Sequence, residues 1–112
     1  MSVDAARVIR VAELLIDVEA ELRRLALWET AAPDPGALAS RQPFCIDTLS
    51  FPQWLQFVFL PRMHALIDED RPLPAKCAVA PMAELYFAGL PLGATRMIAA
   101  LAELDRVIEA GD

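Results

Sequence analysis

Two stretches of the chain carry a regular hydrophobic pattern. In the first, apolar side chains recur at alternating spacings of three and four: Val8, Val11, Leu15, Val18, Leu22 and Leu25. In the second, Met97, Leu101, Leu104 and Ile108 recur at four, three and four. Such spacing places the side chains along one stripe of a helix. We therefore predict a first helix that Asp4 caps and that ends near Trp28 to Thr30, and a last helix that Gly111 ends.

Residues 51–68 have a different pattern, because they are apolar on almost every side of a helix. Ser50 is a good N-cap, and Pro52 falls in the first turn, where its missing N–H does no harm. A helix that is apolar all round is a buried one, so we expect this segment to form the centre of the core. Pro61 removes a backbone donor and clashes with the preceding turn, which predicts a kink near Phe57 to Pro61.

The remaining segments are short and rich in proline. The connection Ala31 to Arg41 is long for a helical bundle, so it crosses between ends of the bundle or carries a short extra turn. A short helix is predicted from Ala80 to Gly89, in which Met82, Leu85 and Tyr86 can face inward. The predicted fold is all-α: one domain over residues 1–112, an irregular four-helix bundle with a buried, proline-kinked central helix.

Composition and charge narrow the function classes. The net charge is -6, and Arg23-Arg24 is the one adjacent basic pair, diluted by neighbouring glutamates. Because nonspecific nucleic-acid binding draws on a basic patch, direct RNA binding is not expected. The N-terminal residues show no secretory signal, and no apolar run is long enough to span a bilayer. Cys45 and Cys77 stand far apart, which indicates two reduced, buried thiols and a cytoplasmic protein without membrane contact.

One cluster of side chains has the chemistry for acid–base work or for holding a small anion: Asp47, Arg62 and His64. On a straight helix Arg62 points among apolar side chains, so we expect its guanidinium to be buried and paired with Asp47 or Glu84. The structural interpretation is that Asp47 and Thr48 tie down a helix start. Arg62 and His64 leave the helix on nearly opposite sides, which favours that interpretation.

Other ligand sites have less support in the sequence. A single histidine and two separated cysteines make a poor set of metal ligands, so we expect no metal and no cofactor. No Gly-rich phosphate loop and no nucleophile motif is present. Trp54 with Phe44 and Tyr86 would line a ligand pocket or, at this helical spacing, belong to the core. Ile9 and Ile16 widen the apolar face of the first helix, which suggests self-association or simply a thick core.

A series of short motifs resembles the YqcC-like family of small bacterial proteins. They are Gln42-Pro43-Phe44, Asp47-Thr48, Trp54-Leu55-Gln56, Pro61-Arg62-Met63-His64, Pro72-Leu73-Pro74 and Ala78-Val79-Ala80-Pro81, over about a third of the chain. The resemblance implies an all-helical domain of unassigned function that is associated by context with tRNA pseudouridine synthase C. It does not imply catalysis, because pseudouridine synthases resemble a strand-rich domain and no strand pattern surrounds Asp47.

Two hypotheses follow for the function. The first is a cytoplasmic, non-catalytic interaction or accessory module, linked to tRNA pseudouridine modification, whose surface is made by Phe44 to Thr48 and Pro72 to Pro81. Its expected partner is a protein, with a homo-oligomer as one form, and RNA only indirectly. The alternative is a small-ligand-binding or enzymatic site around Asp47, Arg62, His64 and Trp54. The candidate binding or structural network comprises Phe44, Asp47, Thr48, Trp54, Gln56, Arg62, His64, Pro72, Pro74 and Pro81, with no residue assigned as catalytic.

Overall fold

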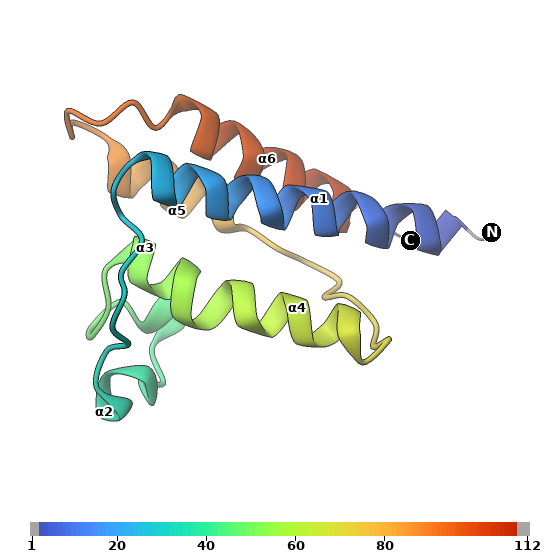
Figure 1. The fold of residues 1–112 in the computed structure, drawn as a ribbon, viewed down its shortest axis with the longest axis horizontal. Helices are drawn as coiled ribbons and strands as arrows, with labels where there is room; N and C mark the ends of the chain where they lie inside the picture. Colours follow the sequence, from blue (N-terminus) through green and yellow to red (C-terminus); the bar gives the residue numbers. More distant parts are fainter. Residues whose placement is uncertain (1–2, 110–112) are drawn as a thin grey trace.

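The computed structural model describes residues 3–109, and within them the fold is entirely helical, as predicted. In chain order the elements are α1 (Val3–Arg24), α2 (Pro35–Leu38), the 3-10 turn η1 (Pro43–Cys45), α3 (Phe51–Trp54), the π-helical turn η2 (Leu55–Phe59), α4 (Leu60–Asp68), α5 (Val79–Phe87) and α6 (Thr95–Glu109). Figure 1 shows α1 and α6 side by side and antiparallel, with α5 next to α6. The continuous rod α3–η2–α4 forms the second layer (Figure 1).

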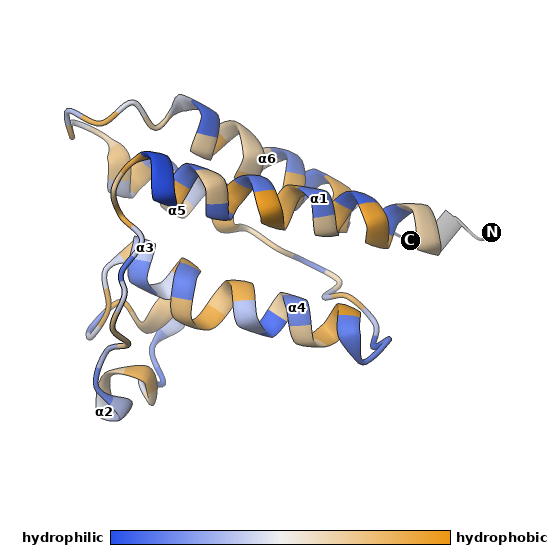
Figure 2. Cartoon of the chain, viewed as in Figure 1, coloured by the Kyte–Doolittle hydropathy of each residue, from blue (hydrophilic) through white to orange (hydrophobic). Residues whose placement is uncertain are grey.

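The predicted seams of α1 and α6 form the first half of the core. Their buried members are Val11, Leu15, Val18 and Leu22 on α1 and Met97, Leu101, Leu104 and Ile108 on α6, each 0 or 1% exposed. Val8 and Leu25, the ends of the predicted stripe, are half-buried. In Figure 2 α1 alternates between hydrophilic and hydrophobic bands, as expected for a helix with one buried side. The three-and-four spacing therefore identifies the buried sides of α1 and α6 correctly.

The first helix ends earlier than the sequence predicts. It stops at Arg24 rather than near Trp28 to Thr30, because Ala26 adopts a left-handed conformation with φ 61°. The N–H of Leu27 then donates to the carbonyl of Leu22 at 2.8 Å, which closes the helix end in the Schellman manner. No proline is needed for this stop. Two further predictions lie outside the part of the chain that the structure describes. They are the cap by the side chain of Asp4 and the helix end at Gly111.

The rod runs from Phe51 to Asp68 as predicted, and its irregularity falls where a kink was expected. Ser50 caps it in a full capping box: the N–H of Gln53 donates to the Ser50 hydroxyl, and the N–H of Ser50 to the Gln53 side chain. In η2 the N–H of Leu60 donates to the carbonyl of Leu55, five residues back. Pro61 follows directly and has no N–H. The wide turn relieves the clash that its ring would make in a regular helix.

The far half of the rod is more exposed than its apolar composition predicts. Phe51, Trp54 and Leu55 are buried, but Arg62 and His64 are exposed, and the expectation of a buried, paired Arg62 is wrong. The reason is geometric. A π-turn takes more residues per revolution, so the faces beyond it are rotated relative to a straight helix. In addition, α4 packs against α1 along one side only, as Figure 1 shows.

The shorter segments also depart in part from the prediction. The connection after α1 carries the short extra turn α2. Helix α5 ends before Gly89, whose φ of 77° suits glycine. The expected inward face of α5 is correct for Met82, which packs half-buried against the core. It is wrong for Leu85 and Tyr86, which are 73% and 37% exposed, while Ala83 and Phe87 are buried instead. None of the helices in residues 3–109 is long and apolar enough to cross a membrane.

Candidate functional site

The turn that contains Phe44 is the centre of the candidate site. Phe44 and Cys45 both adopt positive φ, 57° and 49°, a conformation that is uncommon and strained for residues with a side chain. The N–H groups of Cys45 and Ile46 close the 3-10 turn onto the carbonyls of Gln42 and Pro43. The turn holds the half-buried ring of Phe44 edge-on to Trp54, with the ring centroids 4.7 Å apart.

Asp47 and Thr48 hold this turn against the preceding connection. The hydroxyl of Ser40 donates to the carboxylate of Asp47, and the hydroxyl of Thr48 donates to the carbonyl of Ala37 at 2.7 Å. Their predicted role was to tie down a helix start, but Ser50 caps that helix with its own hydroxyl. These hydrogen bonds of Asp47 and Thr48 therefore fix the η1 turn and not the start of the rod.

The aromatic side chains continue from Phe44 into the core. Trp54 contacts Phe59 at 5.3 Å between ring centroids and Phe51 at 6.2 Å. Phe51 in turn lies 6.0 Å from Tyr86 on α5. Of the proposed trio, Trp54 is buried, whereas Phe44 and Tyr86 keep part of their surface exposed. The core interpretation is confirmed for Trp54, and none of the hollows described below is lined by all three side chains.

A hydrophobic hollow of about 380 Å³ lies between the η1 turn and α5, and we call it the apolar groove. It is lined by Phe44, Ile46, Leu49, Ser50, Phe51, Met82, Leu85 and Tyr86. Ile46 is 63% exposed and Leu85 is 73% exposed. Of the predicted surface Phe44 to Thr48, Phe44 and Ile46 line this groove. Its second wall is α5 rather than the proline-rich link, and the sequence had assigned those α5 side chains to the core.

A second hollow, of about 230 Å³, lies on the other side of Phe44, and we call it the basic hollow. Its lining comprises Phe44, Trp54, Phe59, Arg62, Met63, Pro74, Lys76, Cys77, Ala78 and Val79. A further hollow of about 390 Å³ shares Phe44, Trp54 and Arg62 and extends toward Ser40 and Gln42. Arg62 therefore lines two hollows that also share Phe44 and Trp54.

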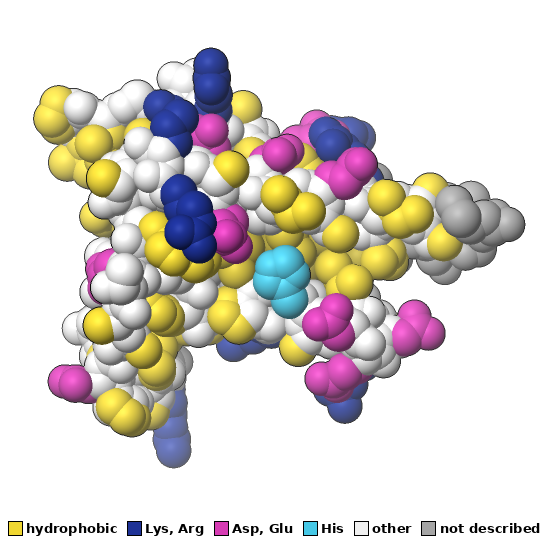
Figure 3. All heavy atoms as spheres, in the orientation of Figure 1, with side chains coloured by type: hydrophobic (Ala, Val, Ile, Leu, Met, Phe, Trp, Pro, Cys, Tyr) yellow, Lys and Arg dark blue, Asp and Glu magenta, His cyan; other side chains and the backbone are white. Residues whose placement is uncertain are grey.

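The predicted acid–base cluster is not assembled. The carboxylate of Asp47 accepts a hydrogen bond from Ser40, and within residues 3–109 Arg62 makes no ion pair with Asp47 or with the exposed Glu84. His64 is exposed and does not line the hollows around Phe44. Figure 3 shows the single histidine at the surface, beside hydrophobic side chains that fill the seam between α1 and α4. Nor do the described residues contain a group of three His, Cys, Asp or Glu side chains that could hold a metal.

The other predicted residues have separate structural roles. The buried Gln56 side chain donates to the carbonyl of Glu29 at 2.7 Å and accepts from the N–H of Glu29 at 2.8 Å. The Gln56 side chain thus satisfies the backbone N–H and carbonyl of Glu29, in the segment that follows α1. Pro74 lines the basic hollow, whereas Pro72 is exposed and Pro81 is exposed in the first turn of α5.

Asp105 on α6 is a structural anchor that the sequence pattern did not indicate. Its carboxylate accepts hydrogen bonds from the N–H groups of Val79 at 3.1 Å and Ala80 at 2.8 Å, so it caps α5 from a neighbouring helix. Burial raises the pKa of the adjacent Cys77 thiol far above its usual range, and hydrogen bonding to Asp105 adds to the effect. The packing of α6 against this loop brings these four residues together.

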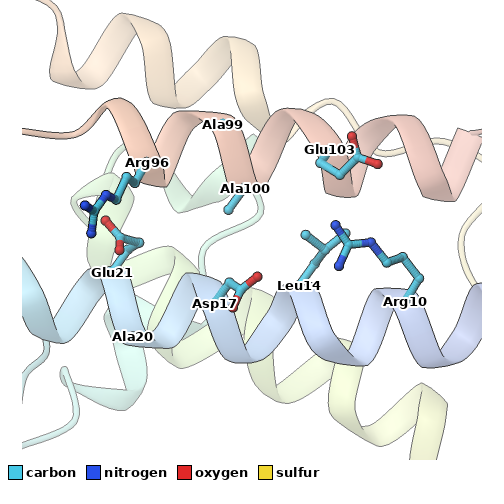
Figure 4. Close-up of a pocket in the computed structure, with 9 residues that line it drawn as sticks. All are labelled: Arg10, Leu14, Asp17, Ala20, Glu21, Arg96, Ala99, Ala100 and Glu103. Carbon is cyan, nitrogen blue, oxygen red and sulfur yellow. The ribbon is translucent and has the colours of Figure 1, made fainter.

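A charged groove of about 380 Å³ lies between α1 and α6. Figure 4 shows Arg96 beside Glu21 and Arg10 across from Glu103, on the two facing helices. Glu21 also accepts a hydrogen bond from Arg24 at 2.7 Å. Arg106 lowers the pKa of the Glu103 carboxyl through a hydrogen bond and its charge. Because both signs alternate along this groove, it favours no single charge of ligand, and we regard it as part of the α1–α6 contact.

Several known proteins are similar to this chain in sequence and in fold. Residues 10–107 match the family described as DUF446: tRNA pseudouridine synthase C. The chain belongs to this family. It is 41% identical over 88 residues to the uncharacterized protein YqcC of Escherichia coli, covering 79% of this chain and 81% of that protein. The solution NMR structure of YqcC from E. coli superposes with a TM-score of 0.82 at 36% identity, over 95% of this chain and 91% of that one. These matches confirm the resemblance to YqcC.

This DUF446 chain spans different shares of the length of two further relatives. An uncharacterized protein of Haemophilus influenzae is 43% identical over 70 residues, which are 62% of this chain and 66% of that protein. A Pectobacterium carotovorum protein named tRNA pseudouridine synthase C is 45% identical over 65 residues, which are 58% of this chain and 17% of that protein. The chain therefore spans about two thirds of the first relative and under a fifth of the second.

Proposed function

We propose that this protein is a non-catalytic accessory module that binds a tRNA pseudouridine synthase in the cytoplasm through the apolar groove. The observation that carries the proposal is the exposure of Ile46 and Leu85 on opposite walls of one hydrophobic hollow. Contiguous exposed apolar surface rimmed by polar residues is typical of protein interaction sites.

The groove is built as a rigid surface. Ile46 follows the strained turn at Phe44 and Cys45, which is held on the far side by Asp47 and Thr48. Leu85 lies on α5, whose first turn is capped by Asp105. A surface whose walls are held in place loses little conformational entropy when a partner binds, which favours affinity.

The relatives support a synthase as the partner. The matched part is 17% of the Pectobacterium protein that carries the synthase name, so the homologous segment there is attached to a much longer chain. Covalent attachment raises the effective concentration of one module beside another, which is how a weak accessory contact becomes permanent. We infer that this chain makes the same contact with a synthase.

The arrangement of polar side chains supports binding rather than catalysis. The carboxylate of Asp47 is occupied by the hydroxyl of Ser40, and Arg62 and His64 belong to different surfaces of the rod. General acid–base catalysis requires such groups within hydrogen-bond reach of one reacting atom. The groove itself is lined by apolar side chains and one serine.

The test is a binding titration with the tRNA pseudouridine synthase encoded in the same genome. We expect a complex with the wild-type chain, and weakening of at least about tenfold for the double variant Ile46→Ser, Leu85→Ser, because anchor residues of interfaces cost more than about 1 kcal/mol each. Ile16→Ser is the matched control, since Ile16 is 65% exposed on α1, outside the groove.

Three outcomes would count against the proposal. They are no complex with the wild-type chain, equal binding by the groove variant, or equal weakening by the Ile16 control. Sedimentation of the chain alone can give a fourth such outcome. A dimer that the substitution Leu85→Ser dissociates would show that a second copy of the chain occupies the groove.

A further inference from the structure

The cationic side chains of this protein divide into two groups. Six of the ten donate to a carboxylate or a carbonyl: Arg7, Arg10, Arg23, Arg24, Arg71 and Arg106. Within residues 3–109, Arg41, Arg62, Lys76 and Arg96 make no such contact. Two of these four, Arg62 and Lys76, line the same hollow, although they come from α4 and from the link before α5. In a protein of net charge -6, two unpartnered cations at one hollow are unexpected.

The surroundings of these cations favour an anion. The basic hollow has Phe44, Trp54 and Phe59 among its walls and no acidic side chain. An apolar wall excludes water on one side, which strengthens the attraction between opposite charges. An arginine and a lysine at such a site supply several N–H donors for a carboxylate or a phosphate.

The basic hollow adjoins the apolar groove. Phe44 lines both, with Ile46 and Leu85 on one side and Arg62 and Lys76 on the other. A partner segment seated in the apolar groove therefore reaches the basic hollow across a single aromatic ring. Recognition at this surface combines apolar anchors with a negative charge next to them.

We propose that Arg62 and Lys76 bind an aspartate or glutamate of the partner, next to the apolar side chains that fill the groove. This inference rests on the proposed function and names the chemistry of the partner segment. An RNA phosphate would satisfy the same two cations, but RNA has no apolar side chains to cover Ile46 and Leu85. Two cations on a chain of net charge -6 also fall short of the basic surface by which RNA-binding proteins neutralise several phosphates.

The experiment compares charge reversals in the same titration against the synthase. We expect Arg62→Glu with Lys76→Glu to weaken binding about tenfold at low salt, and less at high salt, because exposed ion pairs are screened. Arg96→Glu is the control for Arg62→Glu, since it reverses another exposed arginine outside the basic hollow, at the α1–α6 groove. Arg62, Lys76 and Arg96 are all exposed, so these variants should fold normally, which circular dichroism checks.

The outcomes separate this inference from the proposed function. Absence of a complex with the wild-type chain would overturn both. Binding that is lost with Ile46→Ser and Leu85→Ser but is unchanged by the Arg62 and Lys76 reversals would overturn this inference alone. A single-stranded RNA oligonucleotide that binds the chain in the absence of the synthase, and that the same reversals release, would also overturn it in favour of RNA.

Discussion

At the scale of single residues, Cys77 shows how burial decides chemistry. The thiol is buried beside Asp105, and both burial and the hydrogen bond to that carboxylate raise its pKa well above the ordinary value. A thiolate is the reactive form of cysteine, so this side chain is inert at neutral pH. Cys77 lines the basic hollow, where its buried thiol stays protonated at neutral pH.

The raised pKa of Cys77 predicts a loss of stability in alkaline solution. The folded protein holds the thiol proton more tightly than the unfolded chain, whose thiol titrates near about pH 8.5. The stabilisation is complete below that pH and is lost as the pH rises, by up to about 1.4 kcal/mol per unit. Urea unfolding between about pH 7 and pH 10 measures the loss, and Cys77→Ala should reduce the slope. Parallel curves for the wild type and the variant would contradict the assignment.

At the scale of elements, the helices are held at their ends by groups from other parts of the chain. The rod has a local capping box at Ser50, but α5 is capped by Asp105 of α6, and Gln56 of the rod satisfies the backbone at Glu29 after α1. Orphan N–H groups at a helix start must find an acceptor. In α5, nine residues long, that acceptor sets the position of the groove wall that carries Leu85.

Removing the cap of α5 should loosen this element. Asp105→Ala leaves the N–H groups of Val79 and Ala80 without their acceptor, and we expect a loss of about 1–2 kcal/mol in the free energy of unfolding. Amide hydrogen exchange should accelerate first in α5. Glu84→Ala is the control, because Glu84 is exposed on the same helix and its removal should stay within about 0.5 kcal/mol. Equal effects of the two substitutions would show that Asp105 does not hold the helix.

At the scale of the whole molecule, the chain forms two layers with one main seam. α1 packs most extensively against α6, and the rod contacts α1 mainly through α4 (Figure 1). Leu15 and Ile16 are consecutive residues of α1 that differ in burial: Leu15 is 0% exposed and Ile16 is 65% exposed. The same hydrophobic composition therefore contributes very differently to stability on the two sides of one helix.

This contrast gives a direct test of the packing. Leu15→Ala should lower the free energy of unfolding by about 2–5 kcal/mol, because it removes buried methyl groups and leaves a cavity. Ile16→Ala should change it by less than about 0.5 kcal/mol. Chemical denaturation of both variants measures the difference. Similar losses would mean that Ile16 is covered in solution, which would point to self-association through α1.

The sequence by itself determined the features that depend on near neighbours. The seams of α1 and α6, the cap at Ser50, the irregularity before Pro61 and the stop at Gly89 were all predictable, since each depends on residues within a few positions. The family motifs around Phe44 and Trp54 also pointed to the part of the chain that forms the candidate site.

Only the tertiary structure decided which surfaces these elements share. Arg62 is exposed because the π-turn rotates the rod beyond Leu55–Phe59, and a straight-helix projection cannot register that rotation. Leu85 looked like a core residue, but Ala83 and Phe87 occupy the inner face of α5. Whether a side chain is buried depends on which element packs against it. In this protein the residues that line the apolar groove with Phe44 come from segments more than thirty positions apart in the sequence. Local periodicity carries no information about such long-range contacts, because they depend on how the elements pack.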